Sequence, residues 1–166
     1  MKNLVAFLLI VTCLSGCGIQ DTMETISDSL EISVIAPVKQ LEITLPAEAS
    51  SPTLLAEDGA KLYECDGYTL CVQTLAGGDL NRTLREITGF DREVLTVMET
   101  EKDGYTQYNS VWSATGENGD YVGRVLILDD SNYHYTVSVM AEFSKAGELS
   151  DEWQDLLKSV AIKDTD

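Results

Sequence analysis

Hydrophobic and polar positions alternate over most of residues 61–162, a pattern that is typical of β-strands. Short runs at 61–65 and 68–75 flank an Asp66-Gly67 pair, which favours a two-residue hairpin turn. Longer alternating runs follow, and each ends in turn-forming residues. After the first hairpin, the pattern therefore predicts four further strands, at 94–101, 105–115, 120–128 and 132–143.

Helical periodicity occurs in two other segments. Leu80, Leu84 and Ile87 recur on one helical face, between a possible N-cap at Asp79 and a C-terminal glycine at position 89. A second helix is expected at 151–159, with Ser150 as its N-cap and an apolar stripe formed by Trp153, Leu156, Leu157 and Val160.

The order of these elements predicts an α+β fold. Consecutive hairpins make antiparallel neighbours, so we expect an antiparallel sheet of about six strands. Val125 and Ile127 are apolar, and so are their neighbours Val122, Leu126 and Leu128 on the opposite face of the same strand. Because both faces of this strand are apolar, we expect both sides of the sheet to be covered, either by one helix on each face or by a helix and part of the N-terminal segment.

The N-terminal residues predict export and lipid attachment. Lys2 precedes an apolar run at 4–14 that is too short to span a membrane but typical of a secretory signal. The run ends in Leu14-Ser15-Gly16-Cys17, which resembles the bacterial lipobox. The resemblance implies cleavage before Cys17 and acylation of its thiol. The protein is then expected on the extracytoplasmic face of the cell membrane, with membrane lipid as a partner through Cys17.

The domain organisation follows from these boundaries. Residues 1–16 are interpreted as the signal peptide, 17–59 as the lipidated Cys17 with an acidic tether, and 60–166 as the folded domain. The tether segment contains all three prolines of the chain. Two alternating stretches inside it, at 30–34 and 41–45, leave open whether part of the tether docks as a strand.

The net charge of the chain narrows the possible partners. With 28 acidic and 11 basic side chains, the 166 residues carry a formal charge of −17. Nucleic-acid binding requires a basic surface, so nucleic acid is excluded as a general partner.

Residues 62–162 as a whole resemble the PsbP-like superfamily. The features in common are the early hairpin, the helix after it, the run of long antiparallel strands and the final helix that begins at Asp151 and contains Trp153. The resemblance implies an α/β/α sandwich with a binding or scaffolding role. It supplies no catalytic residue, because the superfamily shares no catalytic motif.

The candidates for chemistry are few. His134, the single histidine, could act as the general base of an envelope hydrolase, although the chain lacks a Gly-x-Ser-x-Gly motif. The acidic turn 129–132, with Glu117 or Asp120, could bind a divalent cation such as Ca²⁺. The glycines before Asp79 are interpreted as a loop with a helix cap, because the Lys of a phosphate-binding loop is missing.

Three further groups of residues have open interpretations. Cys65 and Cys71 point to opposite faces if the hairpin turn has two residues, whereas a disulfide needs a three-residue loop. Three arginines form either a solvated face or a small contact for an anion or partner: Arg82, Arg85 and Arg92. Six aromatic residues belong either to the core or to a binding patch: Tyr105, Tyr108, Trp112, Tyr121, Tyr133 and Tyr135.

Taken together, the sequence predicts a non-enzymatic, membrane-anchored lipoprotein whose domain binds an envelope protein or a small ligand. No cofactor and no metal site is assigned, and Cys17 is the one assigned site residue. A hydrolase using His134 and a divalent-cation binder are the two alternatives.

Overall fold

The computed structural model describes residues 36–57, 59–117 and 119–164. The signal peptide predicted at 1–16 and the lipid attachment predicted at Cys17 lie outside these residues. No helix within the described ranges is long and apolar enough to cross a membrane.

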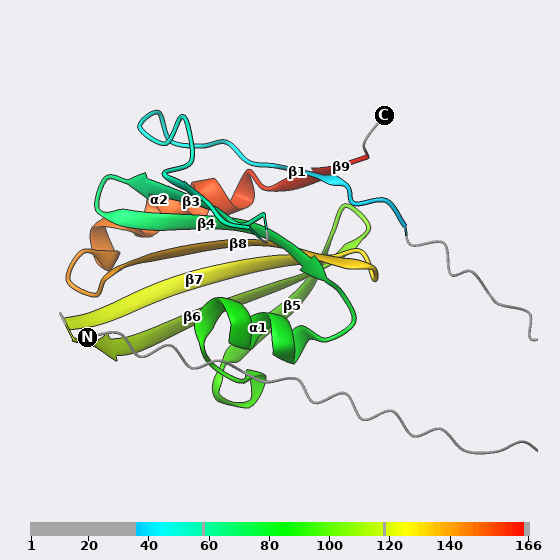
Figure 1. The fold of residues 1–166 in the computed structure, drawn as a ribbon. Helices are drawn as coiled ribbons and strands as arrows, with labels where there is room; N and C mark the ends of the chain where they lie inside the picture. Colours follow the sequence, from blue (N-terminus) through cyan, green and yellow to red (C-terminus); the bar gives the residue numbers. More distant parts are fainter. Residues whose placement is uncertain (1–35, 58, 118, 165–166) are drawn as a thin grey trace, which may run out of the picture. The chain divides into compact units, whose positions relative to one another are not determined.

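An antiparallel sheet of seven strands forms the centre of the described domain (Figure 1), in the order β2-β3-β4-β8-β7-β6-β5. This arrangement confirms the predicted α+β class. Its strands are β2 (Leu54–Leu55), β3 (Lys61–Cys65), β4 (Tyr68–Ala76), β5 (Thr96–Lys102), β6 (Tyr105–Gly116), β7 (Gly119–Asp129) and β8 (Tyr133–Glu142).

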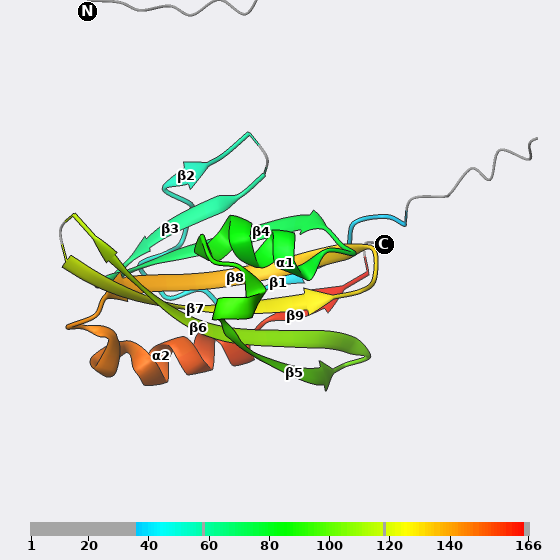
Figure 2. The same cartoon turned by 90° about the horizontal axis from the view of Figure 1, so that it is seen from below.

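Helices cover both faces of this sheet, as Figure 2 shows. On one face lie α1 (Leu80–Thr88) and the short 3-10 helix η1 (Arg92–Val94). On the other face lie α2 (Ala146–Lys158) and a two-stranded ribbon of β1 (Gln40–Glu42) and β9 (Ala161–Lys163). The predicted α/β/α sandwich is thereby confirmed.

Each face of the sheet has its own apolar core. On the α2 side, Trp153 and Leu156 pack against Val137 and Val139 of β8 and Leu126 of β7. On the α1 side, the smaller core consists of buried Leu84, Val125 and Ile127, with partly buried neighbours that include Leu80 and Ile87. The apolar residues on both faces of β7 therefore serve two cores at once.

The first helix begins and ends where the sequence predicts. The Oδ1 atom of Asp79 accepts a hydrogen bond from the Arg82 amide at 3.0 Å. Gly89 adopts a left-handed φ of 79°, and its amide closes the helix on the Arg85 carbonyl.

The prediction for the second helix is wrong at its N-terminus. The helix α2 begins at Ala146, five residues before the predicted start, and Ser150 lies inside it. Its N-cap residue, Lys145, makes no side-chain capping bond. The extra turn forms because Ala146 and Leu149 pack against the core, and this tertiary packing outweighs a local capping preference.

The predicted boundary at residue 60 is also corrected. Leu41 of β1 pairs with Ile162 of β9, and Ala49 is 1% exposed in the larger core. The second alternating stretch of the expected tether therefore docks, because Leu41, Ile43 and Leu45 bury apolar surface against this core. The folded domain therefore includes β1 and the segment up to Ala49, which lie before the predicted boundary.

Candidate binding groove

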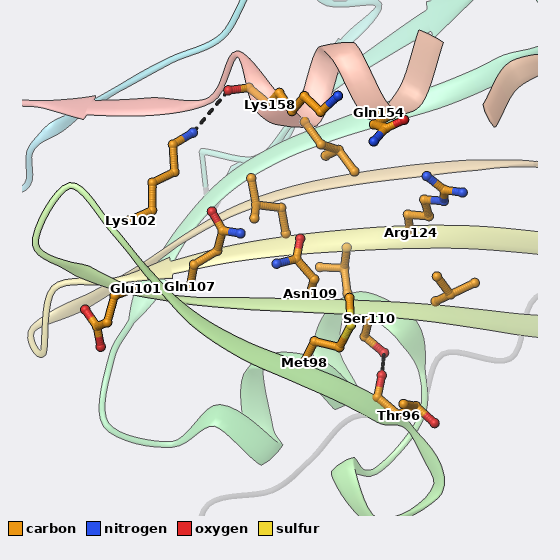
Figure 3. Close-up of a pocket in the computed structure, with 14 residues that line it drawn as sticks. Thr96, Met98, Glu101, Lys102, Gln107, Asn109, Ser110, Arg124, Gln154 and Lys158 are labelled. Atoms are coloured by element: carbon orange, nitrogen blue, oxygen red, sulfur yellow. Dashed lines mark hydrogen bonds between the residues drawn. The ribbon is translucent and has the colours of Figure 1, made fainter. Parts of the chain in front are cut away.

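A groove separates α2 from the outer strands of the sheet, as Figure 3 shows. Its volume is about 830 Å³, which is within the range of about 300–1,000 Å³ typical of ligand sites. The groove exists because α2 packs mainly on the central strands, while β6 and β5 extend the sheet beyond the helix.

The floor of the groove is apolar, and it extends from the buried core to side chains that are exposed to solvent. Leu126 on β7 is buried, whereas Val111 on β6 and Met98 on β5 are 56% and 63% exposed. Leu157 of α2 provides an apolar wall opposite them. Large exposed apolar side chains that border on a pocket are typical of binding surfaces rather than of ordinary protein surface.

Amide side chains are interspersed with these apolar residues. Gln107 and Asn109 are half-buried on β6, and Gln154 lies on α2. The side chains of Gln107 and Asn109 make no hydrogen bond to any described residue. Each amide has donors and acceptors available to a ligand.

Positive charge is concentrated at the ends of the groove. Near one end, Lys102 Nζ donates to the carbonyl of Lys158 at 3.1 Å and to that of Val160 at 2.7 Å. These two bonds tie the end of β5 to the end of α2, where the helix dipole favours a cation. Glu101 is the one acidic residue among those that line the groove.

Arg124 occupies the other end of the groove. It is half-buried, and its Nη2 donates to Ser150 Oγ at 3.0 Å. Within the described ranges, Arg124 forms no ion pair. Since a guanidinium has five N–H donors, most of them remain available to an anionic group in the groove.

His134, the candidate general base, lies inside the domain beneath α1. Its side chain is 1% exposed, and its Nδ1 lies 2.7 Å from Oγ1 of Thr83, which is also 1% exposed. The carboxylate of Asp129 lies 3.5 Å from His134 Nε2. In this conformation the imidazole links α1 to the sheet and is closed to a substrate.

In the acidic turn 129–132, the carboxylates considered for a cation site accept hydrogen bonds from backbone amides of the turn itself. Asp129 accepts the Ser131 amide at 2.7 Å, and Asp130 accepts the amides of Asn132 and Tyr133 at 3.0 and 2.8 Å. Asp120 lies at the opposite end of β7 and cannot join this turn. Among the described residues, no group of three or more His, Cys, Asp or Glu is arranged to hold a metal.

Three of the predicted aromatic residues hold the chain's own segment before β1. Tyr133 donates its hydroxyl proton to the Ala36 carbonyl at 3.0 Å. Tyr135 accepts the Lys39 amide at 2.9 Å and donates to Asp130 Oδ2 at 3.2 Å. Lys39 Nζ lies 3.2 Å from the hydroxyl of Tyr105. Burial raises the pKa of Tyr135, so it remains a neutral donor.

The other aromatic candidates have separate positions. Tyr108 packs with the smaller core beside α1, and burial raises the pKa of its hydroxyl. The Trp112 ring lies over Gly123, with its centroid 6.3 Å from that of Phe90. These side chains therefore do not form one shared patch with the tyrosines around Lys39.

The arginine and cysteine candidates have local roles. Arg82 donates to the Ala76 carbonyl at 3.1 Å, and Arg85 pairs with Asp91. The two cysteines are free thiols. Cys65 pairs with Tyr68 and Leu62 pairs with Cys71, which confirms the register predicted for a two-residue turn.

The groove itself was not found by sequence reasoning. One signal for it was present: the α2-facing positions of β7 are Val122, Arg124, Leu126 and Leu128, so a single arginine interrupts an apolar series. A lone charge on an otherwise buried strand face indicates either a buried partner or a ligand.

The described residues form an α/β/α sandwich with an open groove between α2 and the β5–β6 edge of the sheet. No protein-family model and no curated protein sequence matches the chain. The chain is similar in structure to the cyanobacterial PsbP protein CyanoP from Synechocystis sp. PCC 6803, with a TM-score of 0.55. The two are 12% identical, and the match covers 74% of this chain and 86% of CyanoP.

Two further solved structures share the fold. LpqN of Mycobacterium tuberculosis matches with a TM-score of 0.51 and 9% identity, over 76% of this chain and 84% of LpqN. A Bacteroides thetaiotaomicron protein matches with a TM-score of 0.51 and 11% identity, over 74% of this chain and 45% of that protein. At these identities the likeness establishes the fold, and function is argued from the groove.

Proposed function

We propose that the protein is a lipid-anchored, extracytoplasmic binding protein of the cell envelope, without enzymatic activity, whose groove holds a segment of a partner or a small ligand. The observation that carries this proposal is the groove between α2 and the β5–β6 edge, with its exposed apolar floor and its available Arg124.

The location part of the proposal rests on the N-terminal sequence. Lys2, the apolar run at 4–14 and the lipobox-like 14–17 together match a lipoprotein signal. LpqN, which shares the fold, is described as involved in cell envelope biogenesis, and this adds support by analogy.

The anchor is tested by a single substitution. In the native cells, Cys17→Ser is expected to move the protein out of the membrane fraction, because the acyl chains supply the membrane affinity. A control variant, Cys65→Ser, is expected to stay with the membrane. If C17S remained membrane-bound to the same extent, Cys17 would not be the anchor.

The groove is tested by site-specific photo-crosslinking in the native envelope. A benzophenone amino acid replaces Val111, which is 56% exposed on the groove floor, or Val94, which is 71% exposed on η1 outside the groove. We expect a defined adduct from position 111 and none from position 94. Equal labelling from both positions, or none from either, would contradict a binding role for the groove.

A further inference from the structure

We infer that the ligand of the groove is an extended peptide segment with an acidic side chain that faces Arg124. This inference deepens the proposed function and rests on it. A peptide fits this groove because polar amide side chains follow its length, apolar side chains lie beside them, and the Arg124 guanidinium is available at one end.

Charge complementarity predicts that the ligand carries a negative charge. The chain carries −17 overall, yet three cations and one carboxylate line the groove. Arg124 has no acidic partner among the described residues although acidic side chains are abundant in the chain. A guanidinium held by one bond to Ser150 presents the fork that binds a carboxylate in a bidentate manner.

The amide side chains favour a peptide over an acyl chain. Gln107 and Asn109 point into the groove in Figure 3, and Gln154 lines it from α2, near Arg124. A peptide backbone supplies both N–H donors and C=O acceptors for such amides, whereas an acyl chain would leave them unpaired at a cost. The apolar positions Met98, Val111 and Leu157 then receive alternate side chains of the peptide.

The length of the groove matches a short extended segment. Lys102 is paired with Tyr105 across the β5–β6 turn, and Arg124 is paired with Val111. Six residues of β6 therefore separate the two ends, or about 20 Å at about 3.3 Å per strand residue. An extended peptide of about six residues covers this distance.

The test uses two matched pools of fluorescent peptides and the full chain in phosphatidylcholine nanodiscs. The peptides are about six residues long, capped at both ends, and rich in Val, Leu, Ser and Thr. One pool has a single Glu at either end position of the peptide, and the other pool has Gln at the same positions. We expect the Glu pool to bind about tenfold more tightly in fluorescence polarisation, because one charge-assisted pair is gained.

Variants connect that preference to the groove. Arg124→Gln is expected to abolish the preference for Glu, whereas Arg82→Gln, on the helix that covers the other face, preserves it. Met98→Glu places a negative charge on a 63% exposed groove position. This variant is expected to weaken binding of the Glu pool without unfolding the domain. Thermal melting of each variant establishes whether it is folded. If R124Q does not fold, the M98E variant still tests the preference for Glu.

Each remaining outcome overturns a defined part of the proposal. Equal binding of the Glu and Gln pools, or a Glu preference unchanged in folded R124Q and M98E, overturns the peptide inference. Binding of a fluorescent fatty acid in an Arg124-dependent manner, with no peptide binding, also overturns it but leaves the binding role of the groove intact. If neither probe binds and Val111 yields no crosslink, the proposed function fails as well.

Discussion

The Nδ1 atom of His134 on β8 lies 2.7 Å from Oγ1 of Thr83 on α1, and both side chains are 1% exposed. Asp129 lies beside the other ring nitrogen, at 3.5 Å from Nε2. A carboxylate there favours a proton on Nε2, so Nδ1 accepts the hydroxyl proton of Thr83. The single histidine of the chain thus acts as a polar link inside the smaller core.

Thr83→Val is expected to destabilise the domain by about 1–3 kcal/mol, because the imidazole nitrogen stays buried and loses its partner. The free energy of unfolding in urea measures the effect. Thr100→Val is the matched control, since Thr100 is exposed on β5 and the same substitution there is expected to change stability by less than about 0.5 kcal/mol. If T83V unfolds at the same urea concentration as the unsubstituted protein, the hydrogen bond between Thr83 and His134 does not contribute to the stability of the domain.

The two thiols on the first hairpin are expected to stay reduced. Cys65 packs with the core on the α2 side, and Cys71 has the opposite strand parity, so the side chains leave opposite faces of the sheet. Burial raises the pKa of the Cys65 thiol, which further slows its oxidation.

The measurement is alkylation of the denatured, unreduced protein with N-ethylmaleimide, followed by trypsin. Both cysteines fall in one peptide, 62–82, between Lys61 and Arg82. Two adducts on this peptide are the expected result. An unmodified peptide lighter by two hydrogens would instead show a disulfide and a distorted hairpin.

The parts of this fold that the sequence predicts are the local ones. Asp66-Gly67 specifies the first hairpin, and Leu62 pairs with Cys71 in the register that a two-residue turn requires. Asp79 and Gly89 set the ends of α1 in the same way, because a cap depends on residues a few positions away.

The parts that the sequence does not predict depend on distant partners. Ser150 has the residue type of an N-cap, but its hydroxyl accepts from Arg124 of β7, so α2 extends past it. The β1–β9 ribbon joins Leu41 to Ile162 across most of the domain. The groove follows from where α2 stops covering the sheet, which is a property of packing rather than of any local motif.

Tyr135→Phe is expected to loosen the segment before β1. The hydroxyl of Tyr135 accepts from the Lys39 amide and donates to Asp130, so its removal deletes two hydrogen bonds. Hydrogen–deuterium exchange in peptides that cover residues 36–45 should become faster, with a loss of stability of about 1–2 kcal/mol.

Tyr63→Phe is the control for this experiment. Tyr63 is 7% exposed on β3, and its hydroxyl makes no hydrogen bond to a described residue. Exchange at 36–45 should therefore be unchanged in Y63F. Equal exchange in Y135F and the unsubstituted protein would mean that the pairing of β1 with β9 alone holds the segment.

A side chain at Gly123 on β7 is expected to destabilise the domain. A Cβ there would lie 2.5 Å from two ring atoms of Trp112 and 2.8 Å from the Val139 carbonyl oxygen. Gly123→Ala must therefore displace the indole or the strand, at a cost of about 1–3 kcal/mol. Urea unfolding followed by tryptophan fluorescence measures the loss of stability, and the native-state spectrum reports on Trp112 together with Trp153.

Gly147→Ala provides the contrast, because no heavy atom lies within 4 Å of a Cβ at that position of α2. Alanine restricts the unfolded chain and favours the helix, so G147A should stabilise the domain by about 0.5–1 kcal/mol. The two glycine substitutions are thus expected to have opposite signs. A G123A variant as stable as G147A would mean that the Trp112 ring does not occupy the space above Gly123.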